Sequence, residues 1–509
     1  MTALHPTRLT RRALLAGLFA SGAGAALGGP SSTLRPVPRP GSVSAAQSAL
    51  DARPALRTTA ADLIREAGLD GQTGFAIRDV DGRGFLERVE ADVQRPPASV
   101  TKAVTALYAL ETLGADHRFS TRVLATGPVE DGIVQGDLIL AGGGDPTLAT
   151  DDLVGLIADL RAQGITGITG RFVAWGGVIP GVKEIEPGQL DQLGYNPSLG
   201  GLNLNYNRVY FGWERSGSGY TVTMDGRSET VRPAVTMATV EIVDRSTPVY
   251  TYSEGNGVDQ WTVARGALGN AGSRWLPVRF PAAYAGEVFA ALAEDAGLTL
   301  PSVVVEDEAP EGEELARHDS EVLVEIVRGM LRYSTNLTAE ALGMAATAAQ
   351  EGAAQDLRSS AATMAEWAGR RAGIAPRFLD HSGLSDQNRI AAAEMATLLS
   401  ADGVRAVLEP VMRGVAIVDD ARRQIPNFPG SARAKTGTLN FVSALAGYAI
   451  SGEGRVMAFA IFNYDPAARE VSKQSLDERP AGTAGFNGRA KRLQQKLVQR
   501  WLVLGDIGG

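Results

Sequence analysis

The sequence predicts a mixed α+β fold that is divided into more than one domain. Helical periodicity marks two stretches, near residues 96–114 and 321–373, while glycine-rich turns separate short strands between about 122 and 305. After residue 432, three predicted strands are followed by a final helix. A length of 509 residues corresponds to about three domains at roughly 100–200 residues each. We therefore expect one composite domain interrupted by one or two inserted α+β domains.

The N-terminus is predicted to be an export signal rather than part of the fold. Arg11 and Arg12 directly precede a short apolar run that extends to about Ala26. The paired arginines indicate the twin-arginine route, and the alternative is an ordinary secretory signal that contains two arginines. We assign 1–26 to this signal and expect the protein in the periplasm or cell envelope. Residues 27–50 are rich in proline, serine and glycine, and are predicted to be a linker.

The first folded segment is predicted to contain a helix, a strand and a second helix. The first helix covers Leu56–Ala67, and the strand Gly74–Val80 is followed by a hairpin turn. Ser99 is expected in the first turn of an amphipathic helix that stops at Gly114.

The middle of the chain, 122–311, is assigned to the inserted accessory domains. Predicted strands include Ile139–Ala141 and Thr221–Met224, and predicted helices include Asp152–Gln163 and Val288–Ala296.

The C-terminal part is predicted to be helical first and then to form a sheet. Helix follows from Glu321, with an alanine-rich helical stretch to about Gly373. The predicted strands are Ala432–Thr438, Ser443–Ile450 and Val456–Phe462. The final helix has an apolar stripe that includes Leu497 and Trp501, beside basic residues. We expect this stripe to pack on the strands, and the alternative is a membrane-surface helix.

The composition excludes several classes of function. A net charge of −8 argues against a nucleic-acid binder, which is usually basic. The absence of cysteine removes thiol nucleophiles, thiolate metal sites and disulfides. No two of the four histidines are four residues apart, so the helical zinc-hydrolase motif is missing. The body of the chain has no apolar run of about 18 residues, so we expect no transmembrane helix there.

Three short motifs occur in a fixed order along the chain. They are Ser99-Val100-Thr101-Lys102, Ser334-Thr335-Asn336 and Lys435-Thr436-Gly437. Each is weak alone, because Ser-x-x-Lys occurs by chance in many helices and Lys-Thr-Gly is only a tripeptide. Together they form the motif set of penicillin-recognising enzymes.

The first motif pairs a nucleophile with a base. Residues three apart on a helix are neighbours on one face, so Lys102 can reach the Ser99 hydroxyl. A serine hydroxyl needs a base to remove its proton, and no histidine is placed to do this. Lys102 must then be neutral, with a pKa lowered to roughly 7–8, and we expect burial and the charge of Lys435 to lower it. The alternative is a capping serine followed by a solvated lysine.

The second motif is expected on a loop after a helix. Ser334 is a candidate for relaying a proton to the leaving amine, and Asn336 for binding the substrate amide and Lys102. These residue types also favour the N-cap of the helix that follows, and both roles are compatible.

The third motif is expected on a strand edge that binds an extended peptide. Lys435 and Thr436 would bind the terminal carboxylate of the substrate, while Gly437 lets the substrate approach the backbone. The N–H groups of Thr438 and Ser99 would form an oxyanion hole. The alternative is an ordinary strand with a solvated lysine.

On these motifs the chain resembles the class C low-molecular-mass penicillin-binding proteins, the D-alanyl-D-alanine carboxypeptidase/endopeptidase group with a large insert. Gly142–Leu148 and Asp380–Ser385 also look like sequences of this family. The resemblance implies a serine β-lactamase/transpeptidase-like domain, with an antiparallel sheet flanked by helices and an all-helical lobe. We assign 51–121 and 312–509 to this catalytic domain.

The resemblance also implies a reaction in two steps on peptidoglycan stem peptides. Ser99 attacks the D-Ala-D-Ala carbonyl and releases D-alanine, and water then hydrolyses the acyl-enzyme. Endopeptidase activity on cross-links, covalent inhibition by β-lactams, and no metal or organic cofactor are further implications.

Two positions depart from the family pattern, and three other functions are alternatives. Thr335 stands where relatives often have Asn or Asp, and His381 stands where a loop usually starts with Gly, so His381 is left out of the catalytic set. A β-lactamase of the same fold is the main alternative, but Glu366 has Arg370 rather than Asn four residues later. An esterase would need only the first motif, and a non-catalytic envelope scaffold would have lost Ser99 or Lys102.

Overall fold

The computed structural model describes residues 58–69, 72–82, 84–353 and 356–507. The predicted export signal, 1–26, and the predicted linker, 27–50, lie outside these residues. In the part of the chain that is described, no helix combines the length and the apolar character needed to cross a membrane.

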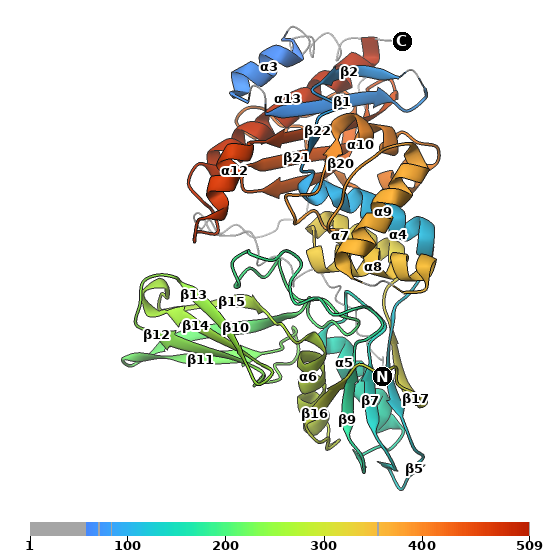
Figure 1. The fold of residues 1–509 in the computed structure, drawn as a ribbon, viewed down its shortest axis with the longest axis vertical. Coiled ribbons are helices and arrows are strands. Elements are labelled where there is room, and N and C mark those ends of the chain that lie inside the picture. Colours follow the sequence, from blue (N-terminus) through green and yellow to red (C-terminus); the bar gives the residue numbers. More distant parts are fainter. Residues whose placement is uncertain (1–57, 70–71, 83, 354–355, 508–509) are drawn as a thin grey trace, which may run out of the picture.

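A six-stranded antiparallel sheet joins segments from the two ends of the described chain (Figure 1). Its strand order is β19-β20-β21-β22-β1-β2. The strands are β1 (Thr73–Asp79), β2 (Phe85–Val89), β19 (Arg413–Gly414), β20 (Ser431–Leu439), β21 (Val442–Ile450) and β22 (Val456–Tyr464). The three predicted C-terminal strands are confirmed, and the predicted N-terminal strand pairs with the last of them.

Helices cover both faces of this sheet. As a result, β21 and β22 are buried along almost their whole length. Alternate residues of β22 belong to two different hydrophobic cores. On one face, α13 (Thr483–Ile507) packs with α3 (Ala60–Ala67), and Trp501 contacts Phe75 and Phe459. On the other face lies α10 (Ala392–Leu399). The prediction that the terminal helix packs on the strands is confirmed.

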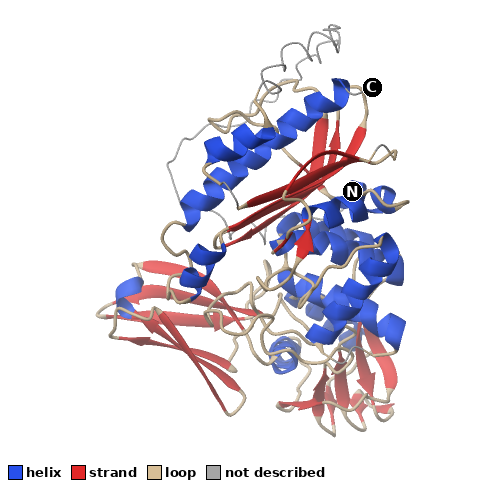
Figure 2. Ribbon diagram, turned by 45° about the horizontal axis from the view of Figure 1, so that its top comes forward, coloured by secondary structure: helices blue, strands red, loops and turns tan. Residues whose placement is uncertain are grey.

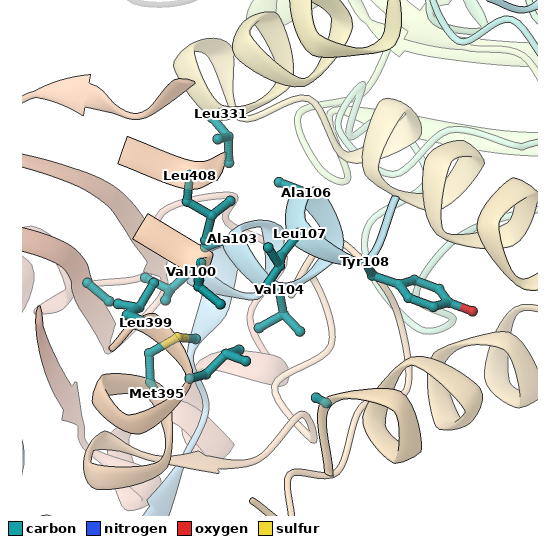
Figure 3. Close-up of a cluster of buried hydrophobic side chains, with 14 of the residues drawn as sticks. Val100, Ala103, Val104, Ala106, Leu107, Tyr108, Leu331, Met395, Leu399 and Leu408 are labelled. Atoms are coloured by element: carbon teal, nitrogen blue, oxygen red, sulfur yellow. The ribbon is translucent and has the colours of Figure 1, made fainter. Parts of the chain in front are cut away.

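An all-helical lobe surrounds α4. Its helices are α4 (Thr101–Leu113), α7 (Leu323–Tyr333), α8 (Asn336–Glu351), α9 (Leu357–Ala372) and α11 (Val404–Leu408). Every residue of α4 from Thr101 to Leu110 is buried, so the prediction of an amphipathic helix was wrong. Figure 3 shows the reason, because side chains from several neighbouring elements, including Leu331, Met395 and Leu408, surround it. The predicted alanine-rich stretch is divided into α8 and α9.

The chain between α4 and α7 forms a second body with its own hydrophobic core (Figure 1). Its five-stranded sheet has the order β16-β9-β7-β4-β17. The elements are β4 (Ser120–Ala125), β7 (Leu138–Ala141), β9 (Phe172–Trp175), β16 (Val303–Glu306), β17 (Glu313–Asp319), α5 (Thr150–Ala162) and α6 (Pro281–Asp295). Because β4 and β17 are paired, the chain enters and leaves this body on adjacent strands.

Two three-stranded sheets extend the second body (Figure 2). The first comprises β10 (Arg208–Ser216), β11 (Gly219–Asp225) and β15 (Ala271–Pro277), and the second β12 (Ala238–Val243), β13 (Tyr250–Gly255) and β14 (Val258–Ala264). Shorter elements are β3 (Gln94–Arg95), β5 (Val129–Glu130), β6 (Ile133–Val134), β8 (Gly167–Ile168), β18 (Ile390–Ala391) and α12 (Pro466–Lys473). The helices predicted in this part of the chain are present as α5 and α6, although α6 begins earlier than expected.

Candidate active site

Ser99 lies in a tight 3-10 turn, Ala98–Val100, that runs directly into α4. The sequence predicted Ser99 in the first turn of the helix itself. In the structure it lies one step earlier, in the tighter turn that precedes α4. Ala98 has φ +46°, a left-handed conformation that is uncommon for a residue with a side chain. Such strain persists only where the surroundings hold it.

Two glycines allow other backbones to approach this turn closely. A Cβ at Gly437 of β20 would lie 2.6 Å from the Pro97 carbonyl oxygen, and a Cβ at Gly383 would lie 1.8 Å from that of Ala98. The sequence explained Gly437 by the approach of a substrate. The structure provides a different reason, because the contact it permits is between β20 and the turn that carries Ser99.

Lys102 stands at the centre of a hydrogen-bonded cluster. Its Nζ lies 3.1 Å from Ser99 Oγ, 2.7 Å from Asn336 Oδ1 and 2.7 Å from the Ser382 carbonyl oxygen. The side chain is fully buried. Burial lowers the pKa of Lys102 to about 7. The nearby carboxyl groups of Glu340 and Asp380 act in the opposite direction and raise this pKa, but their effect is smaller. Burial is thus the main cause of the lowered pKa.

Lys435 is a second buried amine in the site. Its Nζ donates to Ser334 Oγ at 2.9 Å and to the Thr436 carbonyl at 2.7 Å. Burial and the charge of Lys102 hold the pKa of Lys435 well below its usual value. Ser334 occupies the left-handed C-cap of α7, and Asn336 is the first residue of α8. The junction between two helices therefore presents both polar side chains of the second motif to the two lysines.

Acidic residues that the sequence reasoning missed hold the loop beside Lys102. Glu340 accepts from the backbone N–H groups of His381 and Ser382 at 2.8 and 2.9 Å. Asp380 accepts from the N–H of Gly383 at 2.6 Å. Burial raises the pKa of Glu340 to about 8. A signal was available, because Glu340 lies four residues after Asn336 and so on the same face of α8.

His381 is a buried part of the helical lobe. Its Nε2 lies 2.8 Å from Ser360 Oγ, and burial lowers its pKa to about 3. Gly343 of α8 leaves room for the ring, since a Cβ there would lie 2.2 Å from it. This pair of residues explains how the loop accommodates the histidine ring.

A loop from the second body completes the surroundings of Asn336. The side-chain amide of Asn336 donates to the Tyr195 carbonyl at 2.8 Å, while its oxygen accepts from Lys102. The buried Arg279 holds this loop, because its guanidinium donates to three carbonyls at 2.9–3.1 Å. Those carbonyls belong to Lys183, Asp191 and Asn196. Tyr195 could not be found from the sequence, because a backbone carbonyl carries no residue-type signal.

A cleft of about 1970 Å³ opens at these groups, and its walls include Ser99, Ser334, Asn336 and Thr438. Within the described residues, β19 pairs only with Arg433 and Ala434, so the following part of β20 has a free edge on that side. Residues on a strand alternate between its faces. Lys435 and Gly437 are accordingly buried, while Thr436 and Thr438 are exposed. A Cβ at Gly437 would lie 3.1 Å from Ser99 N, so the two backbones that would supply the oxyanion hole are adjacent.

Comparisons with known proteins agree with this arrangement. Residues 56–481 match the D-Ala-D-Ala carboxypeptidase 3 (S13) family. The chain is 28% identical over 439 residues to the D-alanyl-D-alanine carboxypeptidase of Actinomadura sp. (strain R39). The alignment covers 79% of this chain and 79% of the relative. It is 24% identical over 420 residues to D-alanyl-D-alanine carboxypeptidase DacB of Haemophilus influenzae, covering 79% of this chain and 87% of the relative.

A solved structure shares the fold. The crystal structure of penicillin binding protein 4 from Haemophilus influenzae superposes with a TM-score of 0.70 at 19% identity, covering 86% of this chain and 99% of the other. The predicted transpeptidase-like fold with extra domains is therefore confirmed.

Proposed function

Since the chain belongs to the D-Ala-D-Ala carboxypeptidase 3 (S13) family, we propose that it releases D-alanine from peptidoglycan stem peptides through an acyl-enzyme on Ser99. The observation that carries this proposal is the contact between Ser99 Oγ and the amine of Lys102, which burial brings to a pKa of about 7. A serine becomes nucleophilic when a group of this kind accepts its proton.

The hydrogen bonds around Lys102 account for the direction of proton transfer. Asn336 Oδ1 and the Ser382 carbonyl can only accept, so they take two N–H bonds of the amine. In neutral Lys102 the lone pair then faces the remaining neighbour, the Ser99 hydroxyl at 3.1 Å. Ser99 Oγ attacks the carbonyl carbon as its proton moves to Lys102 Nζ. The negative charge on the carbonyl oxygen is stabilised by the N–H groups of Ser99 and Thr438.

The substrate lies along the free edge of β20 in this proposal. Lys435 and Thr436 bind the terminal carboxylate, and this negative charge raises the pKa of Lys435 and favours its ammonium form. Lys102 remains the neutral partner at that stage, because two adjacent buried ammonium groups repel each other. The second amide hydrogen of Asn336, beside the one donated to Tyr195, is available to the substrate.

The tetrahedral intermediate collapses when the leaving nitrogen receives a proton. Lys102 gives up the proton that it took from Ser99, and Ser334 Oγ, which accepts from Lys435 at 2.9 Å, relays this proton to the leaving nitrogen, so that Lys102 is neutral again. D-Alanine departs, and a water molecule takes its place near Lys102. Lys102 then removes a proton from this water, which hydrolyses the ester on Ser99 and restores the hydroxyl.

Three further properties belong to the same proposal. Cross-linked stem peptides are cleaved by the same chemistry, which makes the protein an endopeptidase as well. β-Lactams acylate Ser99 and are released slowly. The protein is exported to the periplasm or cell envelope, which is where its substrate occurs.

The deciding experiment compares wild type with Ser99→Ala. We expect the variant to lose D-alanine release from a stem pentapeptide by about 10⁶-fold, the loss typical of a removed serine nucleophile. Fluorescent penicillin should label the wild type only, and mass mapping should place the adduct on the peptide that contains Ser99. A folded wild type that resists labelling, or an adduct on another residue, would contradict the proposal.

A β-lactamase function would need a carboxylate that activates water for deacylation, and the candidate residue, Glu366, does not suit this role. Glu366 is exposed, and its carboxylate lies 3.9 Å from Arg370 on the surface of α9. A carboxylate in that position cannot activate a water molecule beside an acyl group on Ser99 in the buried cluster. Slow turnover of a chromogenic cephalosporin relative to D-alanine release is therefore expected.

A further inference from the structure

Arg208, in the wall of the cleft, has no hydrogen-bonding partner among the described residues. It is the first residue of β10 in the second body, and its side chain lines the same cleft as Ser99. None of its guanidinium nitrogens donates a hydrogen bond to any described residue. Its Nε is buried, while the residue as a whole is partly exposed to the cleft. No carboxylate of the described chain forms an ion pair with it. Burial lowers the pKa of Arg208, with only tyrosine side chains acting in the other direction.

An arginine that is partly withdrawn from water without a hydrogen-bonding partner costs free energy. Removing a guanidinium from water is expensive unless a partner replaces the lost hydration, and arginine does not escape by losing its proton. The guanidinium carbon lies 5.3 Å from the Tyr206 ring centre and 6.0 Å from that of Trp275, and both residues line the cleft. Ring faces attract a cation, but they leave its N–H donors unsatisfied.

A neighbouring arginine shows what a satisfied guanidinium looks like on the same wall. Arg274 of β15 stacks 5.0 Å over the Tyr250 ring, donates to Glu478 at 2.6 Å and also donates to the Gln192 carbonyl at 3.0 Å. The wall thus offers both aromatic and acidic partners to Arg274, but only aromatic partners to Arg208. The missing element at Arg208 is an acceptor with negative charge.

Arg208 is also connected to the catalytic groups through the chain. A Cβ at Gly194 would lie 3.4 Å from Arg208 Cδ, so the loop that contains Tyr195 runs against the arginine stem. The carbonyl of Tyr195 accepts from the Asn336 amide. A ligand bound at Arg208 therefore lies beside the loop that borders the reacting groups.

We propose that Arg208 binds a carboxylate of the peptidoglycan substrate other than the terminal one. The inference rests on the proposed function, because the terminal carboxylate is assigned there to Lys435 and Thr436. The planar fork of arginine matches a carboxylate with two parallel N–H···O bonds. Tyr206 and Trp275 form apolar flanks that exclude water from these bonds. The subsite selects substrates that carry a second negative charge upstream of the bond that is cut.

The test compares a cross-linked muropeptide dimer with the same dimer in which every carboxylate except the terminal one is amidated. The quantity measured is the ratio of the two kcat/KM values for D-alanine release. We expect wild type to prefer the free acid and Arg208→Gln to lower this ratio by about 10-fold or more, since charge-assisted hydrogen bonds are lost. The loss should appear in KM, because the carboxylate is bound equally in the ground and transition states.

Arg274→Gln is the matched control, because it removes a guanidinium from the same wall whose charge is already paired. It should keep the wild-type ratio. The thermal midpoint separates a ligand site from a structural role: Arg208→Gln should melt no lower than wild type, because it removes a partly buried charge that no hydrogen bond compensates. Arg208→Lys retains the charge without the fork and should give an intermediate ratio.

Several results would overturn the proposal. One is an unchanged ratio in Arg208→Gln or Arg208→Lys while penicillin still labels Ser99, and another is an equal fall in both arginine variants. A lower melting temperature of Arg208→Gln with the wild-type ratio would assign the arginine to packing. A wild type that labels with penicillin but shows no preference for the acid also overturns it. A wild type that neither labels nor releases D-alanine would instead show that the proposed function itself had failed.

Discussion

Two lysines of the catalytic cluster and one arginine in the wall of the cleft are withdrawn from water to different degrees, and their surroundings treat them differently. In the catalytic cluster, Lys102 and Lys435 donate to acceptors at 2.7–3.1 Å. In the wall that the second body contributes, Arg208 donates to no described residue. A lysine amine can respond to burial by losing its proton, which makes it a base. An arginine keeps its charge, so Arg208, partly buried and without a hydrogen-bonding partner, leaves a place for an anion.

The comparison teaches that burial has two chemical uses in one cleft. In the helical lobe it changes a protonation state, and in the second body it prepares a binding site. The two regions meet at Asn336, whose amide is bound by Lys102 on one side and by the Tyr195 carbonyl on the other. Variants in each region should therefore affect different kinetic quantities.

The largest expected effect among these variants is that of Lys102→Ala. Removal of the base should slow acylation by penicillin by about 10²–10⁴-fold, the usual range for general base catalysis. Lys102→Arg is the informative control, because an arginine fills similar space but stays protonated and cannot act as the base. Stopped-flow acylation measures both variants. Near wild-type acylation by Lys102→Arg would break the distinction drawn here between the two kinds of cation.

A smaller effect is expected from Gly437→Ala. The added Cβ would meet the Pro97 carbonyl at 2.6 Å and would push β20 away from the turn that carries Ser99. Overpacking of this kind costs about 1–3 kcal/mol, which corresponds to about 5- to 150-fold in the acylation rate. Gly329→Ala is a suitable control, because a Cβ at Gly329 of α7 has open space. Equal acylation by the two variants would contradict the close approach of β20 to Ser99.

The dependence of acylation on pH follows from the lowered pKa of Lys102. The base is active when neutral, so kcat/KM should rise with pH and level off above about 7. Below that value Lys102 is protonated, and the rate should fall tenfold for each pH unit. The acylation rate constant measured between pH 5 and 9 in wild type checks this prediction. A profile that stays flat through pH 6 would show that Lys102 is already neutral there or is not the base.

The smallest expected effect is that of Arg279→Gln, which acts from the second body. Loss of its hydrogen bonds to three carbonyls should loosen residues 183–196 and so weaken the orientation of Asn336 by Tyr195. We expect acylation to slow about 3–10-fold, since a net hydrogen bond is worth about 1 kcal/mol. The position of the pH limb should not move, because Lys102 stays buried.

Hydrogen exchange provides the second readout for Arg279→Gln. Amides within 183–196 should lose protection, while those of α4 keep it. Arg265→Gln is the control, because Arg265 is an exposed arginine of the same body that pairs with Asp244. Slower acylation with unchanged protection of 183–196 would show that the loop does not transmit the effect.

The spacing of residues along the chain predicted many of the helices and strands, and the error at α4 has a clear physical cause. The sequence indicated the strands that became β20, β21 and β22, and the spacing that brings Ser99 to Lys102. It predicted α4 as an amphipathic helix, because apolar residues recur at helical spacing, with threonines and a lysine between them. In the structure these polar residues are buried, since partners from α8 and the 380–385 loop satisfy them. Burial of a polar residue depends on partners that the local sequence does not contain.

By itself, the sequence determined which functional groups are available: a serine and a lysine one helical turn apart, the Ser334 and Asn336 pair, and a lysine on a strand. Only the tertiary structure decided how these groups behave. The pKa of Lys102 depends on desolvation by distant segments, the necessity of Gly437 on the turn that packs against it, and the vacancy at Arg208 on the absence of a carboxylate among its described neighbours. Desolvation and charge compensation are set by distance in space, and distance along the chain does not reveal them.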